Sequence, residues 1–216
     1  MSTSILKAST RTTAIMIAFT IIGTAILAYT FDITRDTISK NEEAEKQALI
    51  SQTLPPDIFD NNLVQGAITL PASEQLGTDK PSQAYRASLK GKLSAIVLEV
   101  VAPDGYSGKI KLLVGILSNG DISGVRVVAH NETPGLGDYI DIAKNTWIKI
   151  FDHTSLSKLR PQDWKVKKDG GQFDYMAGAT ITPRAVVKAV HKSLLYFEKN
   201  QAQLLATDTT NPERQP

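Results

Sequence analysis

An uncharged stretch of 20 residues near the N-terminus constrains the fold of this chain more than any other feature. It covers residues 12–31, between Arg11 and Asp32, and contains the run AIMIAFTIIGTAILAY. A helix needs about 20 predominantly apolar residues to cross the hydrocarbon core of a bilayer. The apolar core of a cleaved signal peptide is shorter, about 7 to 15 residues, and is followed by an Ala-x-Ala-like site that is absent here. We therefore predict an uncleaved transmembrane anchor.

The charges on either side of this stretch predict its orientation. Lys7 and Arg11 are the only charged residues before it, whereas both signs are mixed in the residues after it. Positively charged flanks stay on the cytoplasmic side. Residues 1–11 are therefore expected in the cytoplasm, with the rest of the chain beyond the span on the other side of the membrane.

Composition excludes several classes of function. The 216 residues include 24 Lys and Arg against 22 Asp and Glu, a balance that argues against a nucleic-acid-binding protein. There is no cysteine, so disulfides, thiolate zinc sites and cysteine-ligated iron–sulfur clusters are excluded. The three histidines, at 130, 153 and 191, do not have metal-ligand spacing. Any redox chemistry must use a cofactor that is held without sulfur, and we predict no metal site.

The remaining sequence predicts one α+β domain. Residues 32–56 contain good helix formers and end at Pro55-Pro56, which indicates a stalk helix. Residues 57–205 form the domain, in which the segment 71–83 is typical of a loop, and residues 206–216 are typical of a disordered tail. Strands are predicted at 93–101, 109–117 and 122–130, with a hairpin at Asn119-Gly120. We expect a mainly antiparallel sheet with flanking helices.

Helical patterns dominate the second half of the domain. The apolar spacing of residues 139–151 fits one face of a short helix, and a further strand is expected near 164–168. Thr182 is a candidate N-cap, with Pro183 in the first turn of an amphipathic helix that runs to about residue 205.

The segment HNETPGLG, residues 130–137, directly follows a predicted strand. As a purely structural feature it is a surface turn, because Pro134-Gly135 is a common turn dipeptide. A functional interpretation is also open, since glycines let the backbone approach a planar ligand closely and His130, Glu132 and Thr133 supply polar groups.

The segment DYMAGAT, residues 174–180, leads into the last helix. It is either a simple helix entry, with Thr180 bonding the first free amides, or a site for phosphate. Free N–H groups and the helix dipole stabilise an anion at a helix N-terminus, and Arg184 and Lys188 follow on the next turns. The small residues from Ala177 to Ala179 leave room for a bulky group on the Thr180 hydroxyl. Spacing alone does not decide between the two.

Together, HNETPGLG and DGGQFDYMAGATIT resemble the FMN-binding domain shared by the G subunit of the Rnf electron-transport complex and the C subunit of the sodium-translocating NADH:quinone reductase. In that family the last Thr of a D-x-x-(S/T)-G-A-T motif carries FMN in a phosphoester bond made by a flavin transferase that uses FAD. The resemblance places Asp174 at the transferase-recognition position and Thr180 at the attachment point, with Gly178 and Ala179 between them. Ala177 departs from the motif, which has Ser or Thr there.

The resemblance covers most of the chain and is closer to the Rnf protein, with the reductase protein as the alternative. It implies covalent FMN on Thr180 and a tethered electron carrier of the bacterial inner membrane, with its domain in the periplasm and no independent catalysis. The implied partners are the other membrane subunits and, during maturation, the transferase. Further contacts with FMN are expected from five residues, which are Glu132, Thr133, Gly135, Leu136 and Thr182.

A function of a different class also fits the residues. A single-span anchored domain could bind a peptide, a cell-wall fragment or another membrane protein through the PDGYSG loop, residues 103–108, and HNETPGLG. DYMAGAT would then be only a helix entry.

Overall fold

The computed structural model describes residues 2–206; within helix α1, nothing is described of the side chains of residues 2–10, 12, 14, 32 and 34–45. The chain forms two compact units that divide between Glu45 and Lys46. Residue 1 and residues 207–216 lie outside the described residues, and the predicted disordered tail falls almost entirely there.

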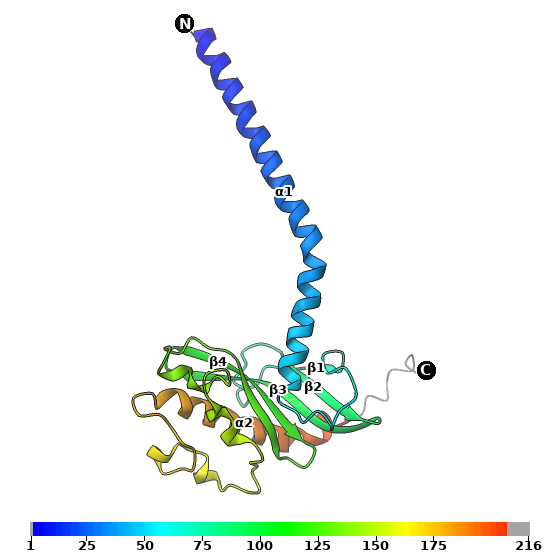
Figure 1. The fold of residues 1–216 in the computed structure, drawn as a ribbon, viewed down its shortest axis with the longest axis vertical. Coiled ribbons are helices and arrows are strands. Elements are labelled where there is room, and N and C mark those ends of the chain that lie inside the picture. Colours follow the sequence, from blue (N-terminus) through cyan, green and yellow to red (C-terminus); the bar gives the residue numbers. More distant parts are fainter. Residues whose placement is uncertain (1, 207–216) are drawn as a thin grey trace. The chain divides into compact units, whose positions relative to one another are not determined.

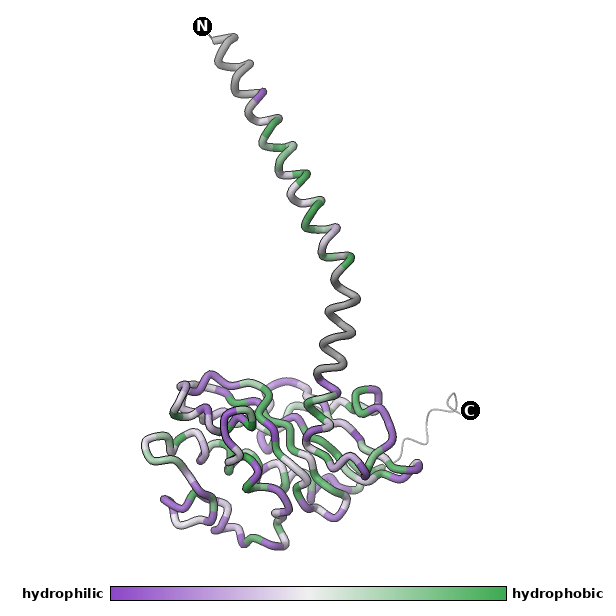
Figure 2. The backbone as a smooth tube through the Cα atoms, viewed as in Figure 1, coloured by the Kyte–Doolittle hydropathy of each residue, from purple (hydrophilic) through white to green (hydrophobic). Residues whose placement is uncertain are grey.

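The long helix α1 (Ser2–Ser51) runs without interruption through the predicted anchor and most of the predicted stalk (Figure 1). Its large apolar side chains between residues 15 and 33 are exposed, and Figure 2 shows this part of the tube as largely hydrophobic. Thr20 and Thr30 donate hydrogen bonds to the carbonyls of Met16 and Ile26, both at 2.8 Å. Among the described residues, we find no helix with both the length and the apolar character that a membrane crossing requires.

The second unit is built on a five-stranded antiparallel sheet whose strands follow one another in chain order (Figure 1). The strands are β1 (Ala67–Leu70), β2 (Ser82–Leu89), β3 (Lys92–Gly105), β4 (Gly108–Leu117) and β5 (Ile122–Ala129). The three predicted strands are therefore confirmed as β3, β4 and β5. β1 and β2 were not predicted, and β2 begins at Ser82, inside the segment expected to be a loop.

Alternating residues along the strands point to opposite faces of the sheet, and each face packs into its own hydrophobic core. On one face Ile96, Leu98 and Val114 pack with the C-terminal helix α2 (Ile181–Leu204). On the other face Val97 and Leu113 pack with Ile50, Leu54 and Leu63. The sheet is thus covered on both faces, which explains why β3 and β4 read as nearly continuous apolar runs.

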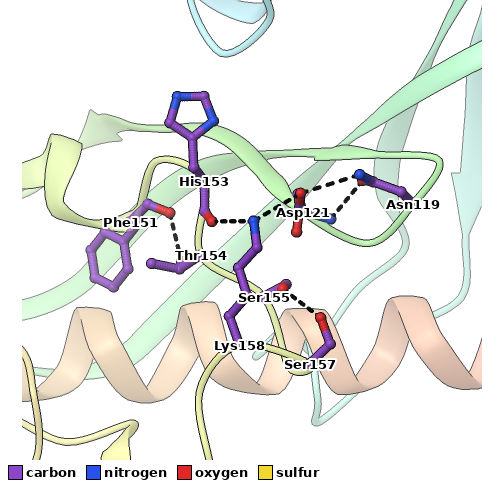
Figure 3. Close-up of polar contacts among 8 residues, drawn as sticks. All are labelled: Asn119, Asp121, Phe151, His153, Thr154, Ser155, Ser157 and Lys158. Carbon is purple, nitrogen blue, oxygen red and sulfur yellow. Dashed lines mark hydrogen bonds and ion pairs between the residues drawn. The ribbon is translucent and has the colours of Figure 1, made fainter.

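The predicted hairpin between β4 and β5 is confirmed. Gly120 has a φ of +89°, and the Asn119 side chain accepts a hydrogen bond from the Asp121 amide at 3.0 Å. Lys158 joins this turn to the following loop: its ammonium donates to Asp121 at 3.0 Å and to the His153 carbonyl at 2.8 Å (Figure 3). The hydrogen bond from Lys158 lowers the pKa of Asp121.

The prediction of one short helix over residues 139–151 is wrong. The segment forms two 3₁₀ helices, η1 (Gly137–Ile140) and η2 (Thr146–Phe151). Between them the Asp141 carboxylate accepts from the Ala143 amide and the Asn145 side chain from the Trp147 amide. Such local bonds satisfy backbone donors outside a helix and compete with helix propagation.

The strand expected near residues 164–168 is also not formed. The segment instead contains two short 3₁₀ helices, η3 (Pro161–Asp163) and η4 (Lys167–Asp169). Val166, which lies between them, forms only an isolated bridge with Phe173, which follows η4. Gly170, in the left-handed conformation with a φ of +81°, ends η4.

Candidate functional site

The loop of residues 130–137 contains a tight turn at the position predicted for it. The Leu136 amide donates to the Thr133 carbonyl at 3.1 Å, and Gly135 has a φ of +76°. Pro at the second position and a Gly with positive φ at the third position are typical of a type II turn. Thr133 and Leu136 are exposed, so both side chains are accessible from solvent.

Glu132, in contrast, points into the protein. It is 4% exposed and accepts hydrogen bonds from the Thr182 hydroxyl and, at 3.0 Å, from the Ser107 amide. A Cβ at Gly105 or Gly137 would lie 2.8 Å from its carboxylate oxygens, so glycine allows this close approach. Glu132 thus joins the 130–137 loop, the β3–β4 turn and the start of α2.

His130 also serves this loop. Its Nδ1 accepts a hydrogen bond from the Glu132 amide at 3.0 Å, and the ring is half-buried. Both His130 and Glu132 therefore brace the loop.

The segment 174–180, here called the attachment segment, lies at the surface. The Ala179 amide donates to the Met176 carbonyl at 3.1 Å, and Gly178 has a φ of +86° in this turn. The side chains of residues 174–177 are exposed, and the space beside Gly178 is open, with no atom within 4 Å of a Cβ placed there. Asp174 forms an ion pair with Lys167 at 2.5 Å.

Thr180, and not Thr182, is the N-cap of α2. Its φ and ψ are helical, and its side chain makes no capping hydrogen bond. The expectation that Thr182 caps this helix is wrong because Thr182 is buried inside the first turn, where its hydroxyl donates to Glu132. Pro183 lies in the first turn as predicted. Thr180 is half-buried, and its hydroxyl lies at the helix N-terminus without making a capping hydrogen bond.

The two cations expected near this helix end have other partners. Arg184 forms a two-pronged ion pair with Asp169 at 2.6 and 2.9 Å, and its hydrogen bond lowers the pKa of that carboxyl. Lys188 pairs with Asp104 at 2.5 Å. An anion at Thr180 would therefore be stabilised by the free amides of the helix end more than by these side chains.

Two contacts join these segments: one links the start of α2 to the 130–137 loop, and the other links the attachment segment to η1, which continues that loop. One is the hydrogen bond from Thr182 to Glu132; the other is the bond from the Met176 amide to the Tyr139 hydroxyl at 3.2 Å. Trp147 adds a bond from its indole N–H to the Asp174 carbonyl at 2.8 Å. The sequence did not predict these contacts of Tyr139 and Trp147. The only indication was that both are aromatic residues with a polar atom in a segment predicted to pack one face against the core.

Large apolar side chains remain exposed on these segments. Their exposed fractions are 47% for Leu136, 37% for Tyr175, 37% for Met176 and 45% for Ile181. Exposed apolar side chains that gather beside a few polar groups are typical of a binding site for an apolar ring.

The geometry of the two segments fits FMN. A phosphate is stabilised by N–H donors, which the start of α2 supplies, and the Thr180 hydroxyl lies at the same position. The ring requires apolar contacts and unobstructed space, which Leu136, Met176 and the open side of Gly178 supply. In the part of the chain that the structure describes, no cluster of three or more His, Asp or Glu side chains could hold a metal ion.

The PDGYSG loop of the alternative prediction borders a separate groove of about 500 Å³ between the β3–β4 hairpin and α2. Its three lysines are each paired with a carboxylate: Lys109 with Asp79, Lys188 with Asp104 and Lys192 with Glu74. The described residues that line the groove therefore balance one another in charge, and none of these pairs leaves a charge that would select a peptide or an anion.

Comparison with known proteins agrees with this geometry. Residues 105–195 match the FMN-binding domain family, and residues 1–53 match the RnfG N-terminal region. Proteins named as the G subunit of an ion-translocating oxidoreductase complex are 46% identical to this chain in Pseudomonas aeruginosa, Vibrio cholerae and Shewanella baltica. The alignments cover 87–88% of this chain and 89–90% of those proteins. This chain therefore belongs to the family of G subunits of ion-translocating oxidoreductase complexes, the Rnf family that its motifs resemble.

Proposed function

We propose that this chain is a membrane-anchored covalent flavoprotein that carries electrons between subunits of an Rnf-type ion-translocating complex. FMN is bound through its phosphate to the Thr180 hydroxyl. The observation that carries the proposal is the hydroxyl of Thr180 at the start of α2, which makes no capping bond where a threonine would ordinarily cap the helix.

Attachment requires Thr180 to act once. A flavin transferase brings FAD, the Thr180 oxygen forms a bond to the FMN phosphorus, AMP leaves, and the hydroxyl proton is released. The product is a phosphodiester with one negative charge, which the free amides of α2 stabilise. Asp174 is exposed and available for recognition by the transferase, although it must then exchange its ion pair with Lys167.

The protein holds the ring and sets its surroundings. FMN supplies the electron-accepting and electron-donating chemistry when it is bound. The Thr133–Leu136 turn offers the exposed side chains of Thr133 and Leu136 to one part of the ring, while its Gly135 and Leu136 amides are bonded to Asp138 and to the Thr133 carbonyl. Met176 and Ile181 flank Thr180 on the other segment. Glu132 keeps the turn in place from the buried side.

The anchor assigned to residues 12–31 keeps the carrier beside its partners. This stretch is uncharged, and its exposed apolar side chains would be unfavourable in water. Lys7 and Arg11 favour a cytoplasmic N-terminus and a periplasmic FMN domain. The partners are the other membrane subunits and, during maturation, the transferase; a net charge of +2 gives no reason to include nucleic acid.

The covalent bond is tested by expressing the chain with a flavin transferase and examining the denatured protein for flavin fluorescence on a gel. The wild-type band should fluoresce, the Thr180→Ala band should not, and a control variant at an exposed threonine of β1, Thr69→Ala, should fluoresce like wild type. A fluorescent Thr180→Ala band would overturn the assignment.

The topology is tested separately with alkaline phosphatase fused after residue 56 or at the N-terminus. Only the first fusion should be active, because the enzyme folds outside the cytoplasm. If the N-terminal fusion were active and the fusion after residue 56 inactive, the orientation would be the reverse of the one proposed.

A further inference from the structure

Two buried aromatic side chains hold the main chain of the attachment segment. The Trp147 indole N–H donates to the Asp174 carbonyl at 2.8 Å, and the Tyr139 hydroxyl accepts from the Met176 amide at 3.2 Å. Asp174 and Met176 flank Tyr175, so the two bonds fix the backbone on both sides of one residue. One ring donates and the other accepts, and both bonds are made to backbone atoms. They are therefore independent of the side chains that the segment presents outward.

The two rings are themselves fixed by the core. Tyr139 is 5% and Trp147 is 8% exposed. Their ring centres lie 5.4 Å apart at an interplanar angle of 82°, and Trp147 makes a second edge contact with Phe151 at 5.6 Å. Edge-to-face packing of this kind restricts the ring orientations. Burial also raises the pKa of Tyr139, so its phenol is neutral around pH 7.

The attachment segment has few other restraints. Residues 174–178 are exposed and have no regular secondary structure, and the ion pair between Asp174 and Lys167 is exposed to solvent. Exposed ion pairs contribute little to rigidity. Tyr139 lies in η1, which begins at Gly137, the last residue of the 130–137 loop. The same aromatic pair therefore fixes the attachment segment relative to that loop.

We infer that Tyr139 and Trp147 are positioning residues of the flavin site. They hold the backbone at Asp174 and Met176 in the shape that the transferase recognises and on which the attached ring rests. This inference rests on the proposed function. Neither side chain takes part in bond formation at Thr180, so loss of either bond affects recognition of the segment and immobilisation of the ring.

The test uses Trp147→Phe and Tyr139→Phe, which keep a ring but remove the bonding atom. The chain offers matched controls. Trp164 is 4% exposed and its indole N–H has no partner in the described part of the chain, and Tyr196 is a buried tyrosine on α2. Trp164→Phe and Tyr196→Phe therefore remove the same atoms from the core without removing a bond to the attachment segment.

Two readouts separate positioning from general stability. In the full-length chain before flavin is added, Tyr139→Phe should speed hydrogen exchange at the Met176 amide about two- to tenfold, the effect of losing one hydrogen bond. In flavinylation assays, Trp147→Phe and Tyr139→Phe should each raise the KM of the transferase for this chain by about two- to tenfold, with kcat nearly unchanged. The attached flavin should also show lower emission anisotropy in both.

The outcomes distinguish the inference from the proposed function beneath it. A wild-type chain that takes up no flavin from an active transferase overturns both. If the wild type is flavinylated but Trp147→Phe and Tyr139→Phe match their controls in Met176 exchange, KM and anisotropy, the inference alone is overturned.

Discussion

Replacing Glu132 with alanine should destabilise the domain. The carboxylate is 4% exposed and accepts hydrogen bonds from the Ser107 amide and the Thr182 hydroxyl. Thr182 is 1% exposed in the intact domain, so removal of the Glu132 carboxylate takes away the acceptor of a buried hydroxyl. A hydrogen bond to a charged group contributes about 1.5 to 3 kcal/mol, and an unsatisfied buried donor costs about 1 to 3 kcal/mol.

These terms overlap, and we expect Glu132→Ala to lower the free energy of unfolding by about 2 to 4 kcal/mol. For a domain of this size that corresponds to about 4 to 16 °C in Tm. Trp147 and Trp164 are the only tryptophans and both are buried, so their fluorescence reports unfolding of the full chain in mild detergent. The exposed Glu198, on α2, provides the control variant Glu198→Ala.

A double-mutant cycle tests the cause of the effect. In a Thr182→Val background the buried hydroxyl is absent, so Glu132→Ala should cost less, with a coupling energy of about 0.5 to 3 kcal/mol. The reasoning would be refuted if Glu132→Ala shifted Tm no more than Glu198→Ala, or if its cost were the same with and without the Thr182 hydroxyl.

Gly178, Ala177 and His191 each give a further prediction. Gly178→Ala has space for its methyl group, but the alanine must adopt a φ of +86°, which costs about 1 to 2 kcal/mol. We expect this variant to slow flavinylation because it distorts the turn. An unchanged rate in a timed gel assay would contradict this. Ala177→Ser restores the family motif at an exposed position, so flavinylation should be at least as fast with Tm unchanged, and a slower rate would count against the motif. His191 stacks on Trp164 with ring centres 5.1 Å apart, and burial lowers its pKa in the folded protein. The unfolded chain therefore binds more protons than the folded one as the pH drops below about 6.5, so the free energy of unfolding should fall there. His191→Gln should flatten this part of a urea-denaturation pH profile, and an unaltered profile would exclude His191 as its cause.

Local pattern predicted the parts of the fold whose structure is decided locally. β3, β4 and β5 have apolar, β-branched runs bounded by turn residues, and α2 has an uninterrupted apolar face. β1 has only four residues, and β2 carries Gln83 and Arg86 among its apolar positions, so neither gives a clear alternation. Their pairing is fixed by the neighbouring strands, which sequence reasoning cannot see.

The sequence predicted two segments around one FMN, but not the contacts that join these segments. Glu132 and Thr182 are 50 residues apart in the sequence, and no periodicity connects them. The cap of α2 was misplaced because Thr180 and Thr182 are chemically equivalent candidates, and only the buried partner of Thr182 separates them. Similarly, Arg184 and Lys188 have the spacing of phosphate ligands, while their acidic partners Asp169 and Asp104 lie on distant segments.

The central claim is that FMN is bound to Thr180, and mass spectrometry of the peptide containing this residue tests it most directly. The chain is produced with an active flavin transferase, digested, and fragmented to locate the added mass. We predict a peptide heavier by FMN less one water, with the modification on Thr180 and absent from the Thr180→Ala variant. An unmodified Thr180 in protein exposed to a transferase that modifies a control substrate, or FMN located on another residue, would contradict the account.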